Sequence, residues 1–209
     1  MTREIIAILR GVRPDEVAAI GEALVAAGID RIEVPLNSPD PLRSIATLVE
    51  TLAGRALIGA GTVLTPADVD AVRSAGGKLI VSPDCNPAVI DRTKELGLQS
   101  YPGTATPTEC FTALRHGADG LKLFPAFLVG TKGIGAIRAV LPADTKTYAV
   151  GGVGPDNFRD WFAAGITGFG IGASIYKPGM SAHEVGELGR RIVTAYDAAP
   201  AGSKMKLGA

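Results

Sequence analysis

The chain has 209 residues, of which 46% are hydrophobic and 20% charged, and its 21 Lys and Arg balance its 21 Asp and Glu. This length and composition fit one well-filled domain, and the absence of net charge disfavours nucleic acid as a partner. No run of about 18 apolar residues occurs and no leader pattern opens the chain, so we expect a cytoplasmic protein that does not enter a membrane.

The cysteines and histidines do not indicate a metal site. Cys85 and Cys110 each stand alone, without CxxC spacing, and are expected to be buried or half-buried thiols. His116 and His183 fall in helix-like segments without a second histidine at ligand spacing, so surface or helix-end positions are expected for them. We therefore expect neither a metal nor a cofactor.

Short β-branched runs alternate with Ala-rich amphipathic runs along the chain. Strands are expected at 4–9, 31–36, 56–61, 78–82, 98–103, 120–125, 145–152 and 167–174. Helices are expected at 17–28, 41–54, 67–77, 87–97, 108–117, 133–141, 157–165 and 182–198. This alternation predicts eight strand–helix units and a parallel sheet.

Residues typical of helix ends support these boundaries. Thr65-Pro66 and Thr106-Pro107 have the pattern of a polar cap followed by a first-turn proline, and Glu109 completes a capping box with Thr106. Helices commonly end at a glycine that adopts the left-handed backbone conformation. Six glycines recur at the expected helix ends: Gly28, Gly54, Gly76, Gly97, Gly117 and Gly165.

Eight such units in about 200 residues close most naturally into a (β/α)8 TIM barrel, which we expect to be a single domain over 1–200. The first turn, 10–13, reads RGVR and lacks the glycine fingerprint of an open dinucleotide-binding sheet. The last residues, 201–209, are expected to be a disordered tail or a remnant of cloning.

One lysine stands inside an apolar strand-like run, ADGLKLFPAF. Because strand residues alternate between two faces, Leu121 and Leu123 are expected to face the helices, while Gly120, Lys122 and Phe124 face the barrel interior. Desolvation lowers the pKa of an amine, and a neutral amine can attack a ketone to form a Schiff base. Such a lysine can also serve only to pair with a carboxylate.

Glu33 in RIEVPLNSP is the matching interior carboxylate. Ile32 and Val34 occupy the helix-facing positions of its strand, so the same alternation turns Glu33 inward. A carboxylate beside an imine can move protons to and from carbon and hydroxyl groups. The pair therefore indicates acid–base imine chemistry, although interior ion pairs also occur for structural reasons.

Glycine-rich turns follow the last two expected strands, AVGGVGPDN at 149–157 and GFGIGAS at 168–174. Backbone amides and helix N-termini in this pair of turns form the usual phosphate cradle of a barrel. Two more candidate ligands end earlier strands: Arg10 in ILRG suits a carboxylate or phosphate, and Thr62 in GAGTV suits a carboxylate or hydroxyl. A phosphorylated small-molecule substrate is expected.

Over nearly its whole length the chain resembles the KDPG/KHG class I aldolases, which cleave 2-keto-3-deoxy-6-phospho sugar acids into pyruvate and glyceraldehyde 3-phosphate. The resemblance rests on the ordered motifs IAILRG, EVPLNSP, LIGAGTVL, YPGTATPTE, LKLFPA and AVGGV. EVPLNSP and AVGGV are more similar to the branch that acts on the 6-phosphogalactonate epimer, which serves galactonate and galactose breakdown. The resemblance also implies a homotrimer.

Matching positions assign roles by resemblance. The Schiff-base lysine falls on Lys122 and the proton-transfer glutamate on Glu33. Arg10 and Thr62 take the substrate-binding positions, and Val150, where the gluconate enzymes have threonine, is expected near the C4 hydroxyl at which the two epimers differ. The phosphate is expected at amides around four residues, with the Ser174 hydroxyl next to them: Gly151, Gly152, Gly172 and Ala173.

Two positions depart from the family pattern: Ala173 replaces the serine that usually follows the glycine, and Tyr101 replaces a small residue or cysteine. Three other functions remain open from the sequence. One is the same cleavage of the gluconate epimer, or of both epimers. Another is a phosphate-barrel isomerase or epimerase with Glu33 as base, and a third is a sugar-phosphate-binding barrel without catalysis.

Overall fold

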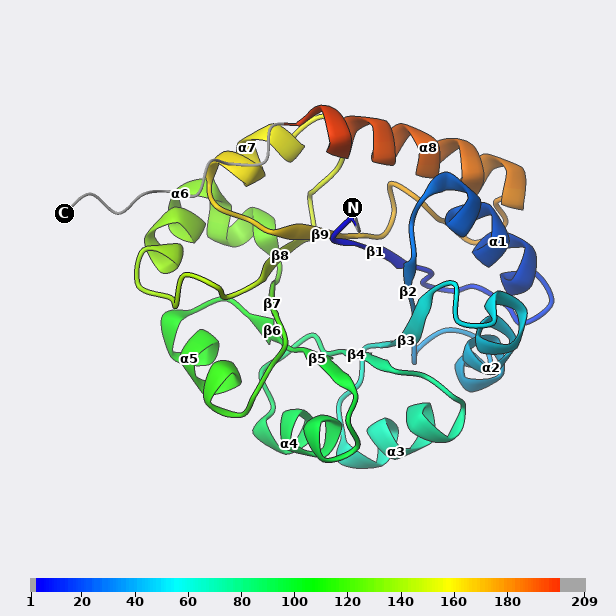
Figure 1. The fold of residues 1–209 in the computed structure, drawn as a ribbon, viewed down its shortest axis with the longest axis horizontal. Helices are drawn as coiled ribbons and strands as arrows, with labels where there is room; N and C mark the ends of the chain where they lie inside the picture. The colour runs from blue at the N-terminus through cyan, green and yellow to red at the C-terminus, as the bar shows by residue number, and fades with distance from the viewer. Residues whose placement is uncertain (1–2, 200–209) are drawn as a thin grey trace.

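The computed structural model describes residues 3–199 as a ring of parallel strands enclosed by helices (Figure 1). The strands are β1 Ile5–Ile8, β2 Arg31–Pro35, β3 Leu57–Gly61, β4 Leu79–Val81, β5 Gln99–Tyr101, β6 Gly103–Thr104, β7 Leu121–Leu123, β8 Thr147–Val150 and β9 Gly168–Ile171. The helices are α1 Val17–Ala27, α2 Pro41–Leu52, α3 Pro66–Ser74, α4 Pro87–Glu95, α5 Pro107–Arg115, α6 Ala126–Arg138, α7 Phe158–Ala163 and α8 Ala182–Ala198. The tail expected at 201–209 lies outside the described residues.

The ring closes at Pro102. The strand order runs β5-β4-β3-β2-β1-β9-β8-β7-β6, so its two ends are β5 and β6, which are separated in the chain only by this proline. Proline has no N–H to donate to a strand ladder, but its carbonyl accepts from the Lys122 amide at 2.9 Å. The two short strands thus make one barrel strand, and the predicted (β/α)8 barrel is confirmed.

The predicted helix caps are also confirmed, but one predicted start is wrong: α6 begins at Ala126 instead of residue 133, ends at Arg138 and is interrupted by a non-helical Gly130. Thr65 and Thr106 each form a capping box, with Asp68 and Glu109 respectively, and a proline opens both helices. The six glycines expected after helices all have φ between 68° and 95°. Those angles belong to the left-handed region, which glycine enters without steric cost.

Strand alternation divides the apolar residues between two cores. The larger core lies between barrel and helices and includes Ile32 and Leu121, both fully buried. The smaller one fills the barrel interior and includes Tyr101 and Tyr148, whose rings meet edge to face with centroids 5.1 Å apart. The Tyr101 hydroxyl donates to Gln99 Oε1 at 3.0 Å. This packing accounts for the tyrosine that departs from the family pattern.

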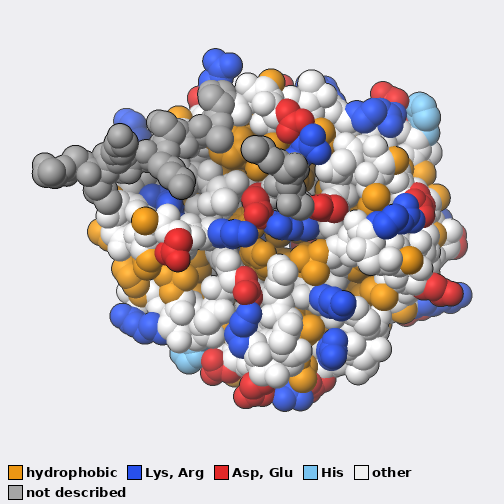
Figure 2. Space-filling view, viewed as in Figure 1, with side chains coloured by type: hydrophobic (Ala, Val, Ile, Leu, Met, Phe, Trp, Pro, Cys, Tyr) orange, Lys and Arg blue, Asp and Glu red, His pale blue; other side chains and the backbone are white. Residues whose placement is uncertain are grey.

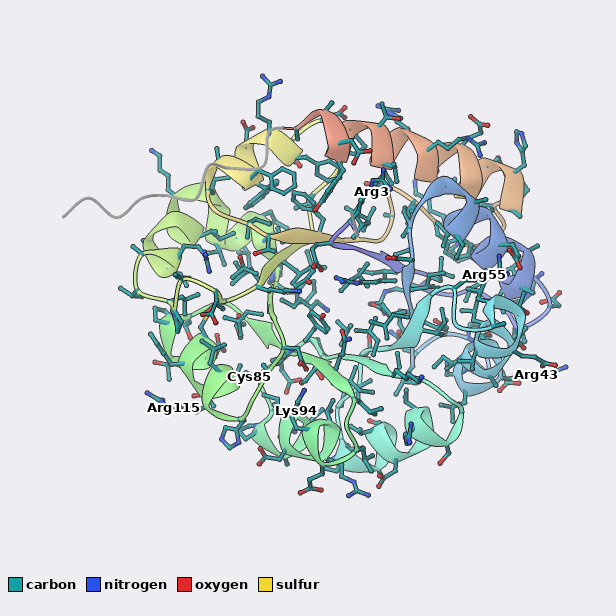
Figure 3. The ribbon with its side chains drawn as sticks, viewed as in Figure 1. Arg3, Arg43, Arg55, Cys85, Lys94 and Arg115 are labelled. Atoms are coloured by element: carbon teal, nitrogen blue, oxygen red, sulfur yellow. The ribbon has the colours of Figure 1, made fainter. Side chains whose placement is uncertain are left out.

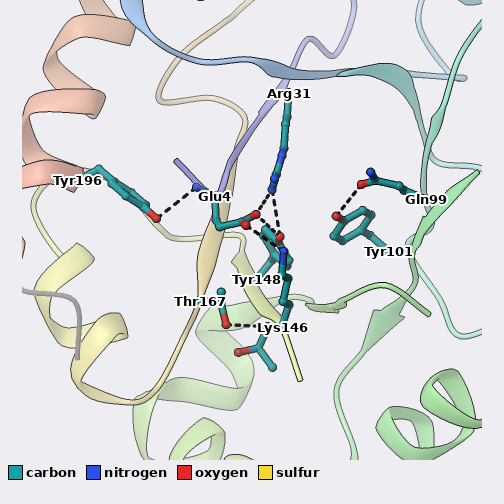
Figure 4. Close-up of polar contacts among 9 residues, drawn as sticks. Glu4, Arg31, Gln99, Tyr101, Lys146, Tyr148, Thr167 and Tyr196 are labelled. Atoms are coloured by element: carbon teal, nitrogen blue, oxygen red, sulfur yellow. Dashed lines mark hydrogen bonds and ion pairs between the residues drawn. The ribbon is translucent and has the colours of Figure 1, made fainter. Parts of the chain in front are cut away.

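A polar network closes the end of the barrel at which the strands begin (Figure 4). The Glu4 carboxylate forms an ion pair with Arg31, accepts from the Tyr148 hydroxyl at 2.5 Å and accepts from Lys146 Nζ at 3.1 Å. The Glu4 amide donates to the Tyr196 hydroxyl of α8 at 3.2 Å. These side chains satisfy each other at this end, and ligands of such barrels bind at the carboxyl ends of the strands.

Surface charge is mixed in sign. Figure 2 shows acidic and basic side chains interspersed over the face viewed, in line with the zero net charge of the chain. Arg43, Lys94 and Arg115 lie on α2, α4 and α5 in the outer ring, and Arg55 lies in the turn after α2 (Figure 3). Among residues 3–199, no helix has the length and apolar character needed to cross a membrane.

A buried hydroxyl in α2 permits a stability test. Ser44 is fully buried, and within the described part of the chain its Oγ has no hydrogen-bond partner. Removing an unsatisfied buried hydroxyl is nearly neutral or stabilising, so Ser44→Ala is expected to leave the free energy of unfolding unchanged or to raise it by about 1 kcal/mol. Ser38→Ala is the matched control, because Ser38 Oγ accepts from the Gly11 amide at 2.9 Å. It is expected to lose about 1–2 kcal/mol. Urea unfolding measures both, and a larger loss in Ser44→Ala would contradict this expectation.

Candidate active site

Lys122 lies inside the barrel, in the middle of β7. Its side chain is 7% exposed, and Leu121 and Leu123 on the opposite face are fully buried against the helices, as strand alternation predicts. Its Nζ lies 4.7 Å from the centroid of the Phe124 ring. Burial lowers the pKa of Lys122, and the nearby Arg10 charge lowers it further, while Glu33 opposes the shift. Lys122 therefore gives up its proton more readily than an ordinary lysine, which makes the nucleophilic amine easier to form.

Glu33 lies in β2 and is 1% exposed. Among residues 3–199, its Oε2 has no hydrogen-bond partner. Burial raises the pKa of Glu33 to about 7, against the opposing effects of Lys122, Arg10 and the Gly61 amide. A carboxyl with this pKa can both accept and release a proton near neutral pH.

Arg10 and Thr62 stand just after β1 and β3, at the same end of the barrel. Arg10 is exposed, and its Nη1 donates to Asn37 Oδ1 at 2.5 Å. The charge of Arg10 acts on both Glu33 and Lys122. Thr62 is half-buried with φ 56°, a left-handed conformation that is unusual for a β-branched residue and typical of constrained functional positions.

Val150 ends β8 and lines the interior cavity beside Glu33 and Lys122. The cavity wall is completed by Ile6, Ile8, Val81, Tyr101, Tyr148 and Gly170. The structure thus brings three of the predicted site residues, from β2, β7 and β8, around one largely apolar space.

The turn after β8 bends through two left-handed glycines, Gly151 with φ 93° and Gly152 with φ 75°. Asn157 braces this turn: its Oδ1 accepts from the Gly154 amide at 3.0 Å and its Nδ2 donates to the Gly152 carbonyl at 2.9 Å. A Cβ placed on Gly154 would lie 3.5 Å from Ser174 Oγ. The two glycine-rich turns therefore lie side by side, as the phosphate-cradle prediction requires.

The turn after β9 differs in one respect from the expectation. The sequence predicts a helix N-terminus adjoining the glycines, but α8 begins only at Ala182. Instead, the amides of Ile175 and Tyr176 donate to the Gly172 carbonyl at 2.9 and 3.1 Å and form an isolated turn. Ala173 and Ser174 are exposed in its first part, so any anion there would meet this turn rather than α8.

Two asparagines that hold the site were missed from the sequence. Asn37 contacts Arg10, and Asn157 contacts the turn at Gly152 and Gly154. Each stands beside a strand-end motif, EVPLNSP or AVGGVGPDN, and asparagine commonly bonds to backbone in such turns. That signal was available, but the partner of Asn37 belongs to a different strand and required the fold.

The cysteines and histidines lie outside this site. Cys85 is half-buried and Cys110 buried, and both are free thiols. His116 caps α5, with its Nδ1 2.7 Å from Asp91 Oδ1, and His183 lies in the first turn of α8. In residues 3–199, no group of three or more His, Cys, Asp or Glu side chains is placed to hold a metal ion.

Comparisons with known proteins agree with this geometry. A family model described as "KDPG and KHG aldolase" matches residues 1–188. The chain is 50% identical to the probable 2-dehydro-3-deoxy-6-phosphogalactonate aldolase of Rhizobium meliloti (strain 1021), over 98% of this chain and 96% of the relative. It is 32% identical to the KHG/KDPG aldolase of Escherichia coli (strain K12), over 69% of this chain and 67% of the relative.

A solved structure described as "Native KDPGal structure" superposes with a TM-score of 0.93 at 45% identity, covering 95% of this chain and 97% of that one. The chain belongs to the KDPG and KHG aldolase family.

Proposed function

We propose that the protein is a class I aldolase that cleaves 2-dehydro-3-deoxy-6-phosphogalactonate into pyruvate and glyceraldehyde 3-phosphate. The observation that carries this proposal is a buried lysine and a buried glutamate on one cavity, with pKa values shifted in opposite directions. Opposed shifts of this kind are typical of acid–base pairs at catalytic sites. The names of the similar proteins support the substrate class.

The reaction begins when the neutral Lys122 amine adds to the C2 ketone of the substrate. The resulting carbinolamine loses water to give a protonated imine, whose nitrogen serves as an electron sink. Glu33, as carboxylate, accepts the C4 hydroxyl proton, directly or through water. The C3–C4 bond then breaks, its electron pair moves toward the imine to form an enamine, and glyceraldehyde 3-phosphate leaves.

Glu33 returns its proton to C3 of the enamine, and water hydrolyses the imine to release pyruvate and the neutral lysine. A carboxyl with a pKa of about 7 suits both halves of this cycle, because neither proton transfer is strongly uphill near neutral pH. Burial of the pair also excludes water that would otherwise protonate the enamine unselectively.

The C1 carboxylate and the phosphate of the substrate would be held at the carboxyl ends of the strands. Arg10 and the Thr62 hydroxyl suit the C1 carboxylate, because a guanidinium and a hydroxyl both donate to oxygen anions. The phosphate would lie between the two neighbouring turns, which expose backbone amides around Gly151, Gly152, Gly172 and Ala173, with the hydroxyl of Ser174 beside them.

Borohydride trapping tests the proposal. Wild-type protein is incubated with pyruvate, reduced with borohydride and digested, and the expected result is a pyruvate-derived mass adduct on the Lys122 peptide. An isomerase or a binding protein that uses Lys122 only as a charge would give no adduct, and that result would overturn the proposal. Trapping without added pyruvate is the control.

Val150 provides a test of epimer preference. Val150→Thr places a hydroxyl on the cavity wall where valine is 7% exposed. A hydrogen bond to one C4 epimer is worth about 1 kcal/mol, so the ratio of kcat/KM for the galactonate over the gluconate substrate is expected to fall by roughly 5- to 10-fold. Val150→Ala, which adds no hydroxyl, is the control and should not favour the gluconate epimer. A wild-type preference for the gluconate epimer would contradict the assignment.

We further propose that the protein is a cytoplasmic homotrimer acting in galactonate breakdown. The family resemblance implies the trimer, and exposed apolar side chains offer surface for it: Phe127 is 63% exposed, Leu128 72% and Val140 59%. Contiguous exposed apolar surface is typical of interfaces, and Phe127 and Leu128 are neighbours at the start of α6. Light scattering coupled to size-exclusion chromatography is expected to give three times the mass of one chain, and a monomer would refute the assembly.

A further inference from the structure

The barrel-facing side of β3 carries no side chain beside Glu33. Alternation along the strand Leu57–Gly61 puts Gly59 and Gly61 on the inner face, and Glu33 is the register partner of Gly59 in the parallel pair β2–β3. From there the glutamate side chain extends along the strand direction and places its carboxylate against Gly61, one inward position nearer the carboxyl end of the barrel.

The space occupied by the Glu33 carboxylate is the space that a side chain at position 61 would need. A Cβ built on Gly61 would lie 2.0 Å from Glu33 Oε2 and 2.4 Å from both Cδ and Oε1, and these are the three nearest atoms. Approaches below 3.0 Å do not occur for real Cβ atoms. Any residue other than glycine therefore has to displace this carboxylate.

Backbone strain does not explain glycine at position 61, and the three atoms nearest to a Cβ there all belong to Glu33. Gly61 is a strand residue outside the left-handed region, so its backbone is accessible to every residue type. Gly59 differs, because a Cβ there would lie 1.8 Å from the Leu79 carbonyl oxygen and would clash with backbone. At position 61 the three closest atoms all belong to the Glu33 carboxyl group, which is where the proposed proton transfers occur.

We propose that Gly61 is a positioning residue for proton transfer: its bare backbone fixes where the Glu33 carboxylate lies relative to the imine carbon chain. This proposal rests on the proposed aldolase function and adds a specific requirement at position 61. Lys122 belongs to β7, which is not a neighbour of β3 in the sheet, so a methyl group at position 61 perturbs the carboxylate directly and the amine only indirectly. Imine formation and proton transfer should consequently separate in a variant.

The test uses Gly61→Ala in the full-length protein with pyruvate as probe. Borohydride trapping on Lys122 is expected within about 3-fold of wild type. Exchange of the pyruvate methyl protons in D2O, followed by NMR, and aldol cleavage are expected to fall by about 10²-fold or more, as for a displaced general base. Gly135→Ala in α6 is the matched control, because a Cβ there meets no atom within 4 Å, and it should exchange protons at the wild-type rate.

A shorter acid separates displacement of the carboxylate from general damage. In the double variant E33D/G61A, the acid at position 33 is one methylene shorter, which leaves room for the methyl group added at position 61. Its rate of pyruvate proton exchange is expected to exceed that of Gly61→Ala by about 10-fold. If Gly61→Ala fails to fold, recovery of a cooperative thermal transition in the double variant supports the steric conflict. An unfolded double variant overturns the proposal.

Wild-type exchange rates in Gly61→Ala, or equal rates in the single and double variants, also overturn the proposal while leaving the aldolase function intact. Wild-type protein that traps no pyruvate would instead refute the aldolase function itself. The two failures are therefore distinguishable within one set of measurements.

Discussion

Lys122→Met is expected to reduce aldol cleavage by about 10⁴-fold or more, because loss of a covalent nucleophile removes the whole imine pathway. Methionine matches the length of the lysine stem and places no charge inside the barrel, where Lys122 is 7% exposed. The free energy of unfolding should consequently be equal to or above that of wild type, because folding no longer has to desolvate or deprotonate a lysine amine. Steady-state cleavage and urea unfolding measure the two effects.

Lys122→Arg is the matched control for charge. It retains a cation but cannot form an imine, and its guanidinium stays protonated in the barrel. If Lys122 acted only through its charge, this variant would retain at least a tenth of the cleavage rate, and that outcome would exclude imine catalysis. We expect instead a loss as large as that of Lys122→Met, and no pyruvate adduct on borohydride treatment.

Glu33→Gln is expected to lower kcat for cleavage by about 10²- to 10⁴-fold while imine formation with pyruvate persists. The amide has nearly the same shape as the carboxyl but cannot exchange a proton. Its effect should therefore fall on proton transfer, seen as loss of pyruvate methyl exchange in D2O. A variant that keeps this exchange would show that another group moves the proton.

The same variant should change how stability depends on pH. The Glu33 carboxyl has a pKa of about 7 in the folded chain against an ordinary value of 4.5, so folding takes up a proton between these values. Its contribution to stability is complete below pH 4.5 and is lost as pH rises through 7. Relative to wild type, Glu33→Gln should thus gain roughly 3 kcal/mol between pH 4.5 and 8. Urea unfolding at both pH values checks the sign.

The pH dependence of catalysis has the same origin. Glu33 must be ionised to accept the C4 hydroxyl proton, and Lys122 must be neutral to attack the ketone, so kcat/KM should rise with pH through about 7. The pKa of Lys122 is also lowered, so the part of the pH profile that reports its deprotonation lies at lower pH than it would for an ordinary lysine. Because the two groups interact, the apparent pKa values of the profile belong to the Glu33–Lys122 pair and not to either residue alone.

Most of the fold could be predicted because it depends on local rules. Short β-branched runs alternate with amphipathic runs and so locate the strands and helices. Threonine–proline pairs mark helix starts and glycines mark helix ends. The alternation of side chains along a strand assigns Lys122 and Glu33 to the barrel interior. All of these are properties of a few consecutive residues, and residues that are close in the sequence are also close in the folded chain. The ninth strand segment also has a local cause, the missing N–H of Pro102, although the sequence alone suggested one continuous strand.

The site could be predicted only in part, because its contacts join separate strands. That Glu33 and Lys122 face the same space follows from alternation, but the pKa of about 7 on Glu33 depends on how completely five or more strands exclude water from it. The bond from Asn37 to Arg10 and the position of the turn after Gly172 likewise depend on neighbours that no sequence motif places.

The sequence by itself determined a barrel of strand–helix units, its interior lysine and glutamate, and the paired glycine turns, because periodicity and turn chemistry are encoded residue by residue. Only the tertiary structure decided how closely these groups meet: the glutamate carboxylate lies where a Cβ of Gly61 would be, and Ser174 Oγ would lie 3.5 Å from a Cβ on Gly154 in the neighbouring turn. Such distances follow from the register of strands far apart in the chain, and register is set by packing of the whole barrel.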